Sequence, residues 1–274
     1  MNEALDALRA SLRHDADPSA LGPALAARFV PLAADDEQES WLREVGARPH
    51  GRLMTSLVGW LDGFGTSYDV HGWLGAYPMH LLGVRAWGEL LGAQPRTSLL
   101  DVGAGAGFVT EGARPHFAQI ACTETSRALR QRLHRRGFEV LDLDLSSAPL
   151  ERSFDVVSCF NVLDRTARPL SLLRALKARL APAGRLLLSL PLPARPHVHV
   201  RGGTIAPSER LPASAQRWEH AARELSDKLL GPEGLLIERL SRVPYLSRGD
   251  AYNVCYALDA AVWVCRSQEH ACSQ

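Results

Sequence analysis

Two polar side chains stand at the end of an apolar run in FDVVSCFNVLDR, which covers residues 154–165. Asn161 ends the run and Asp164 follows three residues later, so an amide carbonyl and a carboxylate can offer hydrogen-bond acceptors to the same small volume. Arg165 comes from the same strand end, although we expect its side chain to point elsewhere and pair with an acid. The alternative is that Asn161 and Asp164 cap the next helix, because Asn and Asp are favoured N-caps. Thr166 lies nearer to that helix and is the better capping candidate.

A glycine-rich loop precedes this segment in LLDVGAGAGFV, residues 99–109. A dinucleotide-binding loop would have its third glycine at position 108, which is Phe, so the loop does not fit NAD. Asp101 followed by Gly103, Gly105 and Gly107 resembles the pattern of class I S-adenosylmethionine methyltransferases. Glycine lets a cofactor approach the strand end and the helix N-terminus closely. We therefore predict S-adenosylmethionine as cofactor and S-adenosylhomocysteine as product.

Acids at the next two strand ends support this prediction. Glu124 lies 21 residues after Gly103, where its carboxylate can accept hydrogen bonds from both ribose hydroxyls. Asp144 ends the following run and is expected to meet the adenine amino group, with Asp142 as the competing candidate. The alternative is a glycine turn in another α/β protein, in which Glu124 only caps a helix. Ligands bind across the carboxyl edge of such sheets, so we predict cofactor binding by Asp101, Gly103, Gly105, Gly107, Glu124, Asp144 and Asn161.

The elements that must position these residues alternate from residue 96 onward between short apolar runs and amphipathic helical segments. This pattern predicts an α/β fold with a seven-stranded, doubly wound, Rossmann-like sheet of the class I methyltransferase type. Its last strand is expected to be antiparallel, because no helix separates the final two apolar runs. We predict a methyltransferase domain over residues 96–268, with an irregular insertion at about 191–215. Residues 1–95 show helical spacing and are expected to pack on the core, where they cover the cofactor or shape a substrate groove.

Composition excludes several classes of partner. The chain of 274 residues has 31 basic and 30 acidic side chains, so bulk charge gives no grip on nucleic acid or an anionic membrane. No apolar run approaches the roughly 20 residues needed to span a bilayer. The N-terminus resembles neither a secretory signal nor a transit peptide, and five cysteines at 122, 159, 255, 265 and 272 lack metal-ligand spacing. We expect a soluble, cytoplasmic monomer with reduced thiols.

A longer part of the chain, Ser98 to Arg266, is similar to the DREV family of protein-histidine methyltransferases. The similarity is carried by SCFNVLDRTARPLSLLRALKARLAPAGRLLLSLPL, RPHVHVRGG and RVPYLSRGDAYNVCYALDAAVWV. Its sharpest matches are Asn161, Leu163, Asp164, Arg165, Pro244, Tyr245, Leu246, Gly249, Asp250, Tyr252, Asn253, Tyr256, Leu258 and Asp259. The chain departs from the family at Ala106, where an acid is usual, at Asp144, where an asparagine is usual, and over residues 1–95.

The resemblance implies methyl transfer to the pros nitrogen of a histidine in a His-x-His protein segment with a small middle residue. It implies a substrate pocket formed by Asn161, Asp164, Arg165, Tyr245, Tyr252 and Asn253. Among these residues we expect Asp164, Asn161 and Tyr252 to be catalytic. The alternative for Tyr245, Tyr252 and Asn253 is ordinary packing of an edge loop.

Imidazole chemistry agrees with this expectation. Neutral imidazole carries hydrogen on one nitrogen and a lone pair on the other, and only the latter can attack a sulfonium methyl group. If Asp164 or Asn161 accepts the hydrogen of the tele nitrogen, the pros nitrogen becomes the nucleophile. Two other functions stay open: methylation of a small imidazole compound such as a histidine dipeptide, and a catalytically silent cofactor-binding module.

The chain contains a His-x-His segment of its own, at His197, Val198 and His199. Two histidines alone make an incomplete metal site, so we predict no metal. A solvated loop is the simplest interpretation. Self-methylation is the other, although Val198 is larger than the middle residue that the family prefers.

Overall fold

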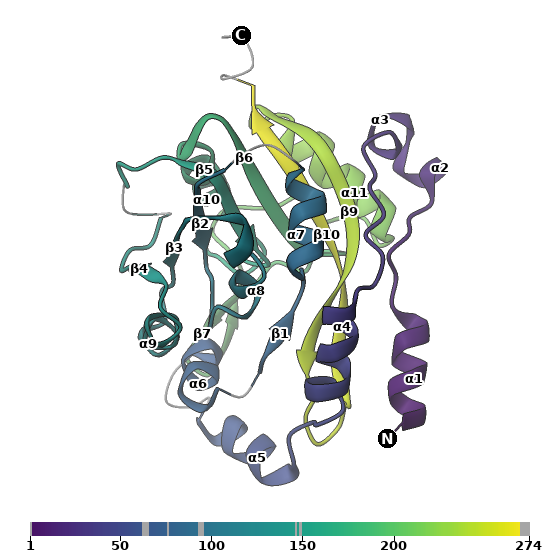
Figure 1. The fold of residues 1–274 in the computed structure, drawn as a ribbon, viewed down its shortest axis with the longest axis vertical. Coiled ribbons are helices and arrows are strands. Elements are labelled where there is room, and N and C mark those ends of the chain that lie inside the picture. The colour runs from purple at the N-terminus through teal and green to yellow at the C-terminus, as the bar shows by residue number, and fades with distance from the viewer. Residues whose placement is uncertain are drawn as a thin grey trace.

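A sheet of eight strands forms the centre of the computed structural model, which describes residues 2–61, 66–75, 77–92, 96–145, 147 and 150–268 (Figure 1). The described residues form ten strands, eight in this sheet and two, β7 and β8, in a separate pair: β1 (Met79–His80), β2 (Ser98–Val102), β3 (Gln119–Thr123), β4 (Glu139–Leu141), β5 (Phe154–Phe160), β6 (Leu180–Pro191), β7 (Val198–Val200), β8 (Gly203–Ile205), β9 (Leu235–Arg248) and β10 (Cys255–Ser267). The order in the large sheet is β1-β9-β10-β6-β5-β2-β3-β4. Strands β2 to β6 pair in parallel, whereas β10 is antiparallel to β6 and β9. The predicted Rossmann-like fold class, with its antiparallel last strand, is confirmed, but the sheet has eight strands and not the predicted seven.

Helices cover both faces of this sheet. They are α1 (Asn2–Ser11), α2 (Pro18–Leu21), α3 (Pro23–Ala26), α4 (Asp36–Trp41), α5 (Arg52–Leu61), α6 (Ser67–Leu74), α7 (Val84–Leu91), α8 (Phe108–Glu111), α9 (Arg127–Arg135), α10 (Pro169–Lys177) and α11 (Trp218–Leu225), with short helical turns η1 (Leu42–Gly46), η2 (Arg114–His116) and η3 (Ser226–Leu230). Within the described residues, no helix is both long and apolar enough to cross a membrane.

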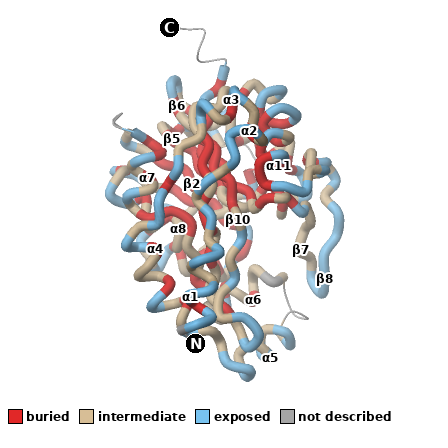
Figure 2. The backbone as a smooth tube through the Cα atoms, turned by 90° about the vertical axis from the view of Figure 1, so that its right-hand side faces the viewer, coloured by how far each residue is buried: buried red, intermediate tan, exposed pale blue. Residues whose placement is uncertain are grey.

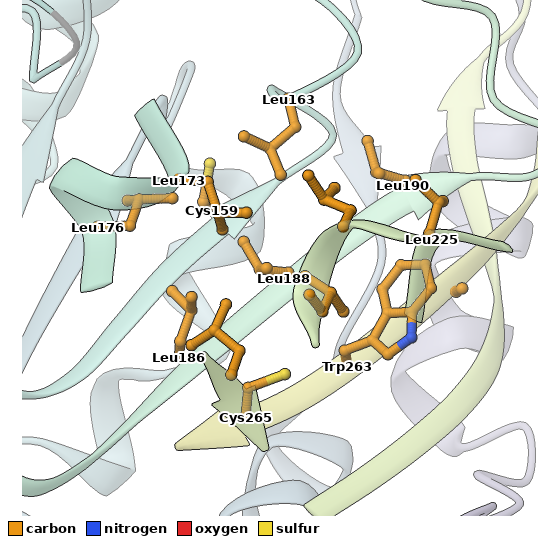
Figure 3. Packing of buried hydrophobic residues seen from close by; sticks show 14 of the residues in the cluster. Cys159, Leu163, Leu173, Leu176, Leu186, Leu188, Leu190, Leu225, Trp263 and Cys265 are labelled. Atoms are coloured by element: carbon orange, nitrogen blue, oxygen red, sulfur yellow. The ribbon is translucent and has the colours of Figure 1, made fainter. Parts of the chain in front are cut away.

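Alternate residues of the central strands enter two separate apolar clusters. In β5, Val157 and Cys159 join the cluster covered by α10 and α11, whereas Val156 faces the cluster that contains Trp87 of α7. Figure 3 shows the first cluster, where Cys159 lies among leucines of α10 and β6, and Figure 2 shows that burial is concentrated along these central strands. Because both faces are buried, a central strand is apolar at nearly every position.

The region before residue 96 contributes a strand as well as helices, contrary to its predicted helical character. Met79 and His80 of β1 pair antiparallel with Ser247 and Leu246 of β9. Two residues are too few to show an alternating pattern, so sequence periodicity could not detect this strand. Between α6 and α9 the approach is close: a Cβ on Gly72 would lie 2.7 Å from the Cβ of Ala128.

The segment predicted as an irregular insertion contains a short hairpin of β7 and β8. Its strands pair from Val198 with Ile205 to Val200 with Gly203, and Gly202 has the positive φ of 75° that the turn requires. The Pro-rich and Gly-rich composition around it concealed this regular element. Figure 2 shows the hairpin at the edge of the molecule, away from the most deeply buried strands.

The thiols agree with the expected reduced state as far as the structure describes them. Cys122, Cys159 and Cys265 are buried free thiols, and Cys255 is a partly buried one. Burial raises the pKa of the Cys159 thiol far above its ordinary value, so this thiol stays protonated and unreactive. The fifth cysteine, Cys272, lies outside the described residues.

Candidate functional site

A cavity of about 910 Å³ lies at the carboxyl ends of β2, β3, β4 and β5. This is the edge at which doubly wound α/β sheets bind their ligands. The N-terminal region completes the cavity through Thr66, Tyr68, Asp69 and His71, which come from the start of α6 and the residue before it. The capping box of Thr66 and Asp69 sets where this helix begins, and Asp69 also accepts a hydrogen bond from the Ser126 hydroxyl at 2.6 Å.

The three glycines of the loop have different tasks, although each has a positive φ. Gly103 and Gly105 line the cavity, and a Cβ on Gly103 would lie only 2.5 Å from Cγ2 of Val162. Gly107 is not among the residues found to line the cavity. A Cβ there would lie 2.9 Å from Leu133 and 3.0 Å from Phe138. The structure therefore places Gly107 where the loop packs against α9 and the residue before β4, and not in the cavity wall, although the sequence predicts that it binds the cofactor.

Asp101 also has a different place from the one predicted. Its buried carboxylate accepts hydrogen bonds from the hydroxyls of Thr110, at 2.6 Å, and Ser158, at 2.7 Å. It is not among the residues that line the cavity. Burial raises the pKa of Asp101, while the two hydroxyls act in the opposite direction. Through these two hydrogen bonds Asp101 joins β2 to α8 and to β5, next to the glycine loop.

Glu124 is where the sequence placed it, on the cavity wall just after β3. Its carboxylate accepts hydrogen bonds from the backbone N–H groups of Gly105 and Ser126, both at 2.9 Å. The glycine loop and the end of β3 are therefore joined through one side chain. Burial raises the pKa of Glu124 above its ordinary value, and the backbone hydrogen bonds oppose this shift.

A pH dependence of cofactor binding follows from the raised pKa of Glu124. We predict that Glu124 accepts hydrogen bonds from the ribose hydroxyls, and its ionised form is the better acceptor, so affinity for S-adenosylhomocysteine should fall by up to about tenfold per pH unit below this pKa. The loss should begin at a higher pH than for an ordinary glutamate, and Glu124→Gln should flatten the profile. Calorimetric titrations at successive pH values measure this.

Protonation of Glu124 does not lower cofactor affinity by unfolding the protein. A carboxyl group whose pKa is raised on folding stabilises the folded state at low pH, and this contribution is lost as the pH rises through the folded pKa. Thermal melts at each pH provide the control. Equal pH dependence in wild type and Glu124→Gln would contradict the assignment.

Of the two acids after β4, Asp144 lines the cavity and Asp142 does not. Asp142 is 76% exposed and pairs with Arg130 at 3.1 Å. Asp144 accepts a hydrogen bond from the Ser147 hydroxyl at 3.0 Å. This placement favours Asp144 as the group near the adenine.

Asn161 directly follows β5 and has the left-handed conformation, with a φ of 58°. Its side-chain oxygen accepts a hydrogen bond from the Ser189 hydroxyl at 2.8 Å, and the residue lines the cavity. Tyr245 lines the same part of the cavity, and burial raises the pKa of Tyr245 to about 12, so its hydroxyl stays a donor. The strain of a positive φ at a non-glycine residue is typical of functional sites.

Asp164 and Arg165 form an ion pair beside Asn161. Nη1 of Arg165 donates to Oδ2 of Asp164 at 2.7 Å, so Arg165 pairs with an acid as expected. Arg165 also lines the cavity, and the expectation that it points elsewhere is wrong. Asp164 is only 1% exposed and is not itself among the lining residues, while its Oδ1 has no hydrogen-bond partner within the described part of the chain. Burial raises the pKa of Asp164, and Arg165 opposes the shift.

The capping alternative for these side chains is wrong. Helix α10 has Arg168 at its N-cap position and Pro169 in its first turn, and no side-chain cap is formed there among the described residues. Instead, Glu209 accepts hydrogen bonds from the backbone N–H and the hydroxyl of Ser171. Asn161, Asp164 and Thr166 are thus not needed to begin the helix.

The loop between β9 and β10 carries Tyr252 and Asn253, but neither is among the residues that line the cavity. Tyr252 is 85% exposed, so the geometry does not bring it to the site as predicted. Asn253 donates from Nδ2 to the Tyr256 hydroxyl at 3.0 Å, and that hydroxyl donates to Asp250 at 2.7 Å. Tyr256 does line the cavity.

Sequence reasoning missed several residues of the cavity wall. Tyr68 was overlooked, although a capping box, Thr66 and Asp69, marks the start of its helix. His199 lines the cavity, although the sequence around it predicts a solvated loop, and Tyr256, which only the family resemblance singles out, lines it too. Burial raises the pKa of the Tyr68 hydroxyl well above its ordinary value.

Parts of this chain are similar in sequence to known proteins. Among curated proteins, it is 30% identical over 138 residues to a ubiquinone biosynthesis O-methyltransferase of Xanthomonas euvesicatoria, an alignment of 47% of this chain and 55% of that protein. A namesake from Xanthomonas campestris is 31% identical over 105 residues, covering 35% and 44%. The chain thus spans about half the length of the curated relatives it matches.

Solved structures resemble it at low identity. The complex of DhpI with SAH has a TM-score of 0.46 and 16% identity, covering 78% of this chain and 97% of that one. The N-methyltransferase NodS of Bradyrhizobium japonicum has a TM-score of 0.42 and 16% identity, covering 65% and 84%.

The family comparison is more extensive. The model of the DREV methyltransferases matches residues 16–267, which is far more than half of the 274 residues. The predicted cofactor, S-adenosylmethionine, is confirmed with this match, and its expected place at the strand ends coincides with the cavity described above. The chain that builds this cavity belongs to the DREV methyltransferase family.

Proposed function

We propose that this methyltransferase transfers the methyl group to the pros nitrogen of a histidine in His-x-His segments of proteins. The observation that carries the proposal is the buried carboxylate of Asp164, whose Oδ1 has no partner in the described part of the chain. An ionised carboxylate only accepts hydrogen bonds, and leaving a buried acceptor unsatisfied costs about 1–3 kcal/mol. A donor on the substrate, such as an imidazole N–H, would satisfy it.

The residues around Asp164 suit this task. Arg165 holds one carboxylate oxygen at 2.7 Å, which orients the side chain and favours its ionised form. Bound S-adenosylmethionine supplies an electrophilic methyl group. Asp164 would accept the tele N–H of the acceptor imidazole, so that the lone pair lies on the pros nitrogen, and its charge would stabilise the growing imidazolium. Histidine is mostly neutral at pH 7, so orientation is the main requirement.

The rim of the cavity favours a protein segment over a small molecule. Tyr256 and Leu258 line the cavity and are also 39% and 46% exposed, which makes this end accessible from solvent. Asp164 is only 1% exposed, and the segment before β7 lies against its backbone, where the N–H of His197 donates to the carbonyl oxygen of Asp164 at 2.9 Å.

The test is methyl transfer from labelled S-adenosylmethionine to a His-Ala-His peptide, an Ala-Ala-His control, a histidine dipeptide and a soluble catechol. The catechol probes the O-methylation named in the curated relatives. We expect label on the His-Ala-His peptide, on the pros nitrogen, as identified by fragmentation and by chromatography of the hydrolysed amino acids. Label on the dipeptide alone, on the catechol alone or on the tele nitrogen would overturn the proposal.

A further inference from the structure

A polar residue interrupts the apolar run of β6 beside the candidate site. Ser189 stands between Leu188 and Leu190, and its side chain is fully buried. A buried hydroxyl is costly unless its hydrogen finds an acceptor. Oγ of Ser189 donates to Oδ1 of Asn161 at 2.8 Å. The hydroxyl in this central strand is therefore directed at a residue that lines the cavity.

The backbone joins the same two residues a second time. The N–H of Asn161 donates to the carbonyl oxygen of Ser189 at 2.9 Å. The parallel pairing of β5 with β6 ends one residue earlier, where Phe160 is the partner of Ser189. Asn161 is thus held to β6 through both its backbone and its side chain, which restricts the directions that its amide can take.

These contacts determine which end of the amide faces β6. The hydroxyl of Ser189 has one hydrogen to donate, whereas the amide of Asn161 has an acceptor at Oδ1 and two donors at Nδ2. If the amide were rotated by half a turn, Nδ2 would face Ser189, and the hydroxyl would lose this acceptor. The Nδ2 group therefore lies on the side away from β6.

Tyr245 lies on that other side of the amide. It lines the cavity together with Asn161. Burial raises the pKa of the Tyr245 hydroxyl, and a hydrogen bond with the Asn161 side chain opposes this rise. The amide of Asn161 is therefore placed between the buried hydroxyl of Ser189 and a hydroxyl in the cavity wall.

We infer that Ser189 is a positioning residue, which holds Asn161 as a hydrogen-bond donor to the ligands of this site. Nδ2 suits a carbonyl or carboxylate oxygen, which both the backbone of a peptide substrate and the α-carboxylate of S-adenosylmethionine offer. The inference deepens the proposed function, on which its peptide part rests, and it leaves Asp164 as the acceptor for the imidazole hydrogen. Ser189 acts through Asn161, because it is not itself among the residues that line the cavity.

The test replaces the hydroxyl and measures both ligands. In Ser189→Ala, Oδ1 of Asn161 loses its donor, and the amide should rotate to accept from the Tyr245 hydroxyl instead. Because a buried acceptor without a partner is costly, the rotated amide should be favoured about tenfold. The ligand that Nδ2 contacts should then bind about tenfold more weakly. The two quantities are the calorimetric affinity for S-adenosylhomocysteine and the KM for the His-Ala-His peptide.

Each outcome has a separate meaning. Weaker binding of S-adenosylhomocysteine alone identifies the cofactor carboxylate as the partner of Nδ2, and a higher KM alone identifies the peptide. Unchanged values of both overturn the inference. If the wild type does not methylate the peptide, the proposed function is wrong, and the inference is then decided by the affinity for S-adenosylhomocysteine, which overturns it when unchanged.

Ser241→Ala is the matched control for the loss of a buried serine hydroxyl. Ser241 is also fully buried in a strand of the same sheet, β9, and its hydroxyl donates to the carbonyl oxygen of Val30 at 2.7 Å. Neither residue is among those that line the cavity. Thermal melts should show a similar loss of stability in both serine variants, whereas only Ser189→Ala should bind a ligand more weakly. Equal changes in ligand binding would reduce Ser189 to a structural role.

A double-mutant cycle shows whether Ser189 acts through Asn161. Asn161→Gly removes the amide and tolerates the positive φ, so adding Ser189→Ala to it should cause no further loss of affinity. Additive losses would contradict the inference. Ser189→Cys keeps a weak donor at this position and should have an affinity between those of the wild type and Ser189→Ala.

Discussion

Asp164→Asn is expected to lower methyl transfer to a His-Ala-His peptide by about 10²- to 10³-fold, a loss typical of removing one group that stabilises transition-state charge. The amide can still accept a hydrogen bond, but it has no charge to stabilise the imidazolium. It also leaves Arg165 without the carboxylate that Nη1 contacts at 2.7 Å. Binding of S-adenosylhomocysteine should change little, because Asp164 is not among the residues that line the cavity. Initial rates and calorimetric titration measure the two quantities.

Asp142→Asn is the matched control, since Asp142 also follows a strand of the sheet but is 76% exposed and pairs with Arg130. It should retain the wild-type rate. The raised pKa of Asp164 adds a second measurement: at saturating cofactor, acidification should lower the wild-type rate by more than protonation of the substrate histidine alone accounts for, and Asp164→Asn should show only the part due to the histidine. An unchanged rate in Asp164→Asn would exclude the proposed role.

Gly103→Ala is expected to have the second large effect, on stability and on cofactor binding together. The new Cβ would stand 2.5 Å from Cγ2 of Val162 at a residue with a φ of 72°. The positive φ costs about 1–2 kcal/mol for a non-glycine residue, and the overlap adds about 1–3 kcal/mol of overpacking. The chain must move at Gly103 or Val162 to relieve the overlap. Because both residues line the cavity, this movement should also weaken binding of S-adenosylhomocysteine.

Gly137→Ala separates the two causes, because Gly137 has a φ of 78° with no described atom within 4 Å of the added Cβ. In Gly137→Ala the free energy of unfolding should fall only by the cost of the positive φ. Its affinity for S-adenosylhomocysteine should not change. In Gly103→Ala, Val162→Ala should restore part of the loss, because it removes the γ-methyl group that overlaps. Chemical denaturation and calorimetry on the wild type, Gly103→Ala, Val162→Ala and their double variant measure this coupling, with Gly137→Ala as the fifth protein. Equal losses in both glycine variants would show that the contact with Val162 is unimportant.

The fold and the location of the site were predictable because their signals are local. Buried parallel strands must be apolar, and each one ends where a polar residue follows, so Glu124 and Asn161 marked strand ends in the sequence. The carboxyl ends of such strands meet at one edge of the sheet. Phe108 separated the glycine loop from a dinucleotide-binding one. Each of these inferences needs only neighbours along the chain.

Other residues were misplaced because their neighbours are distant in sequence. Gly107 meets Leu133 and Phe138, and Asp101 meets Ser158, contacts that no pattern around the glycine loop specifies. β1 was missed because its two residues became a strand only by pairing with β9.

The sequence by itself determined the class of protein, the cofactor and the strand ends that form its site. The spacing of apolar residues, the positions of the glycines and the family motifs are all local features of the sequence. Only the tertiary structure decided which side chains face the cavity. Tyr256 faces it while Tyr252 lies in solvent, and His199 reaches it although its composition suggested a loop. The physical reason is that a side chain's direction depends on hydrogen bonds and packing between segments far apart in sequence, such as the bond from His197 to Asp164.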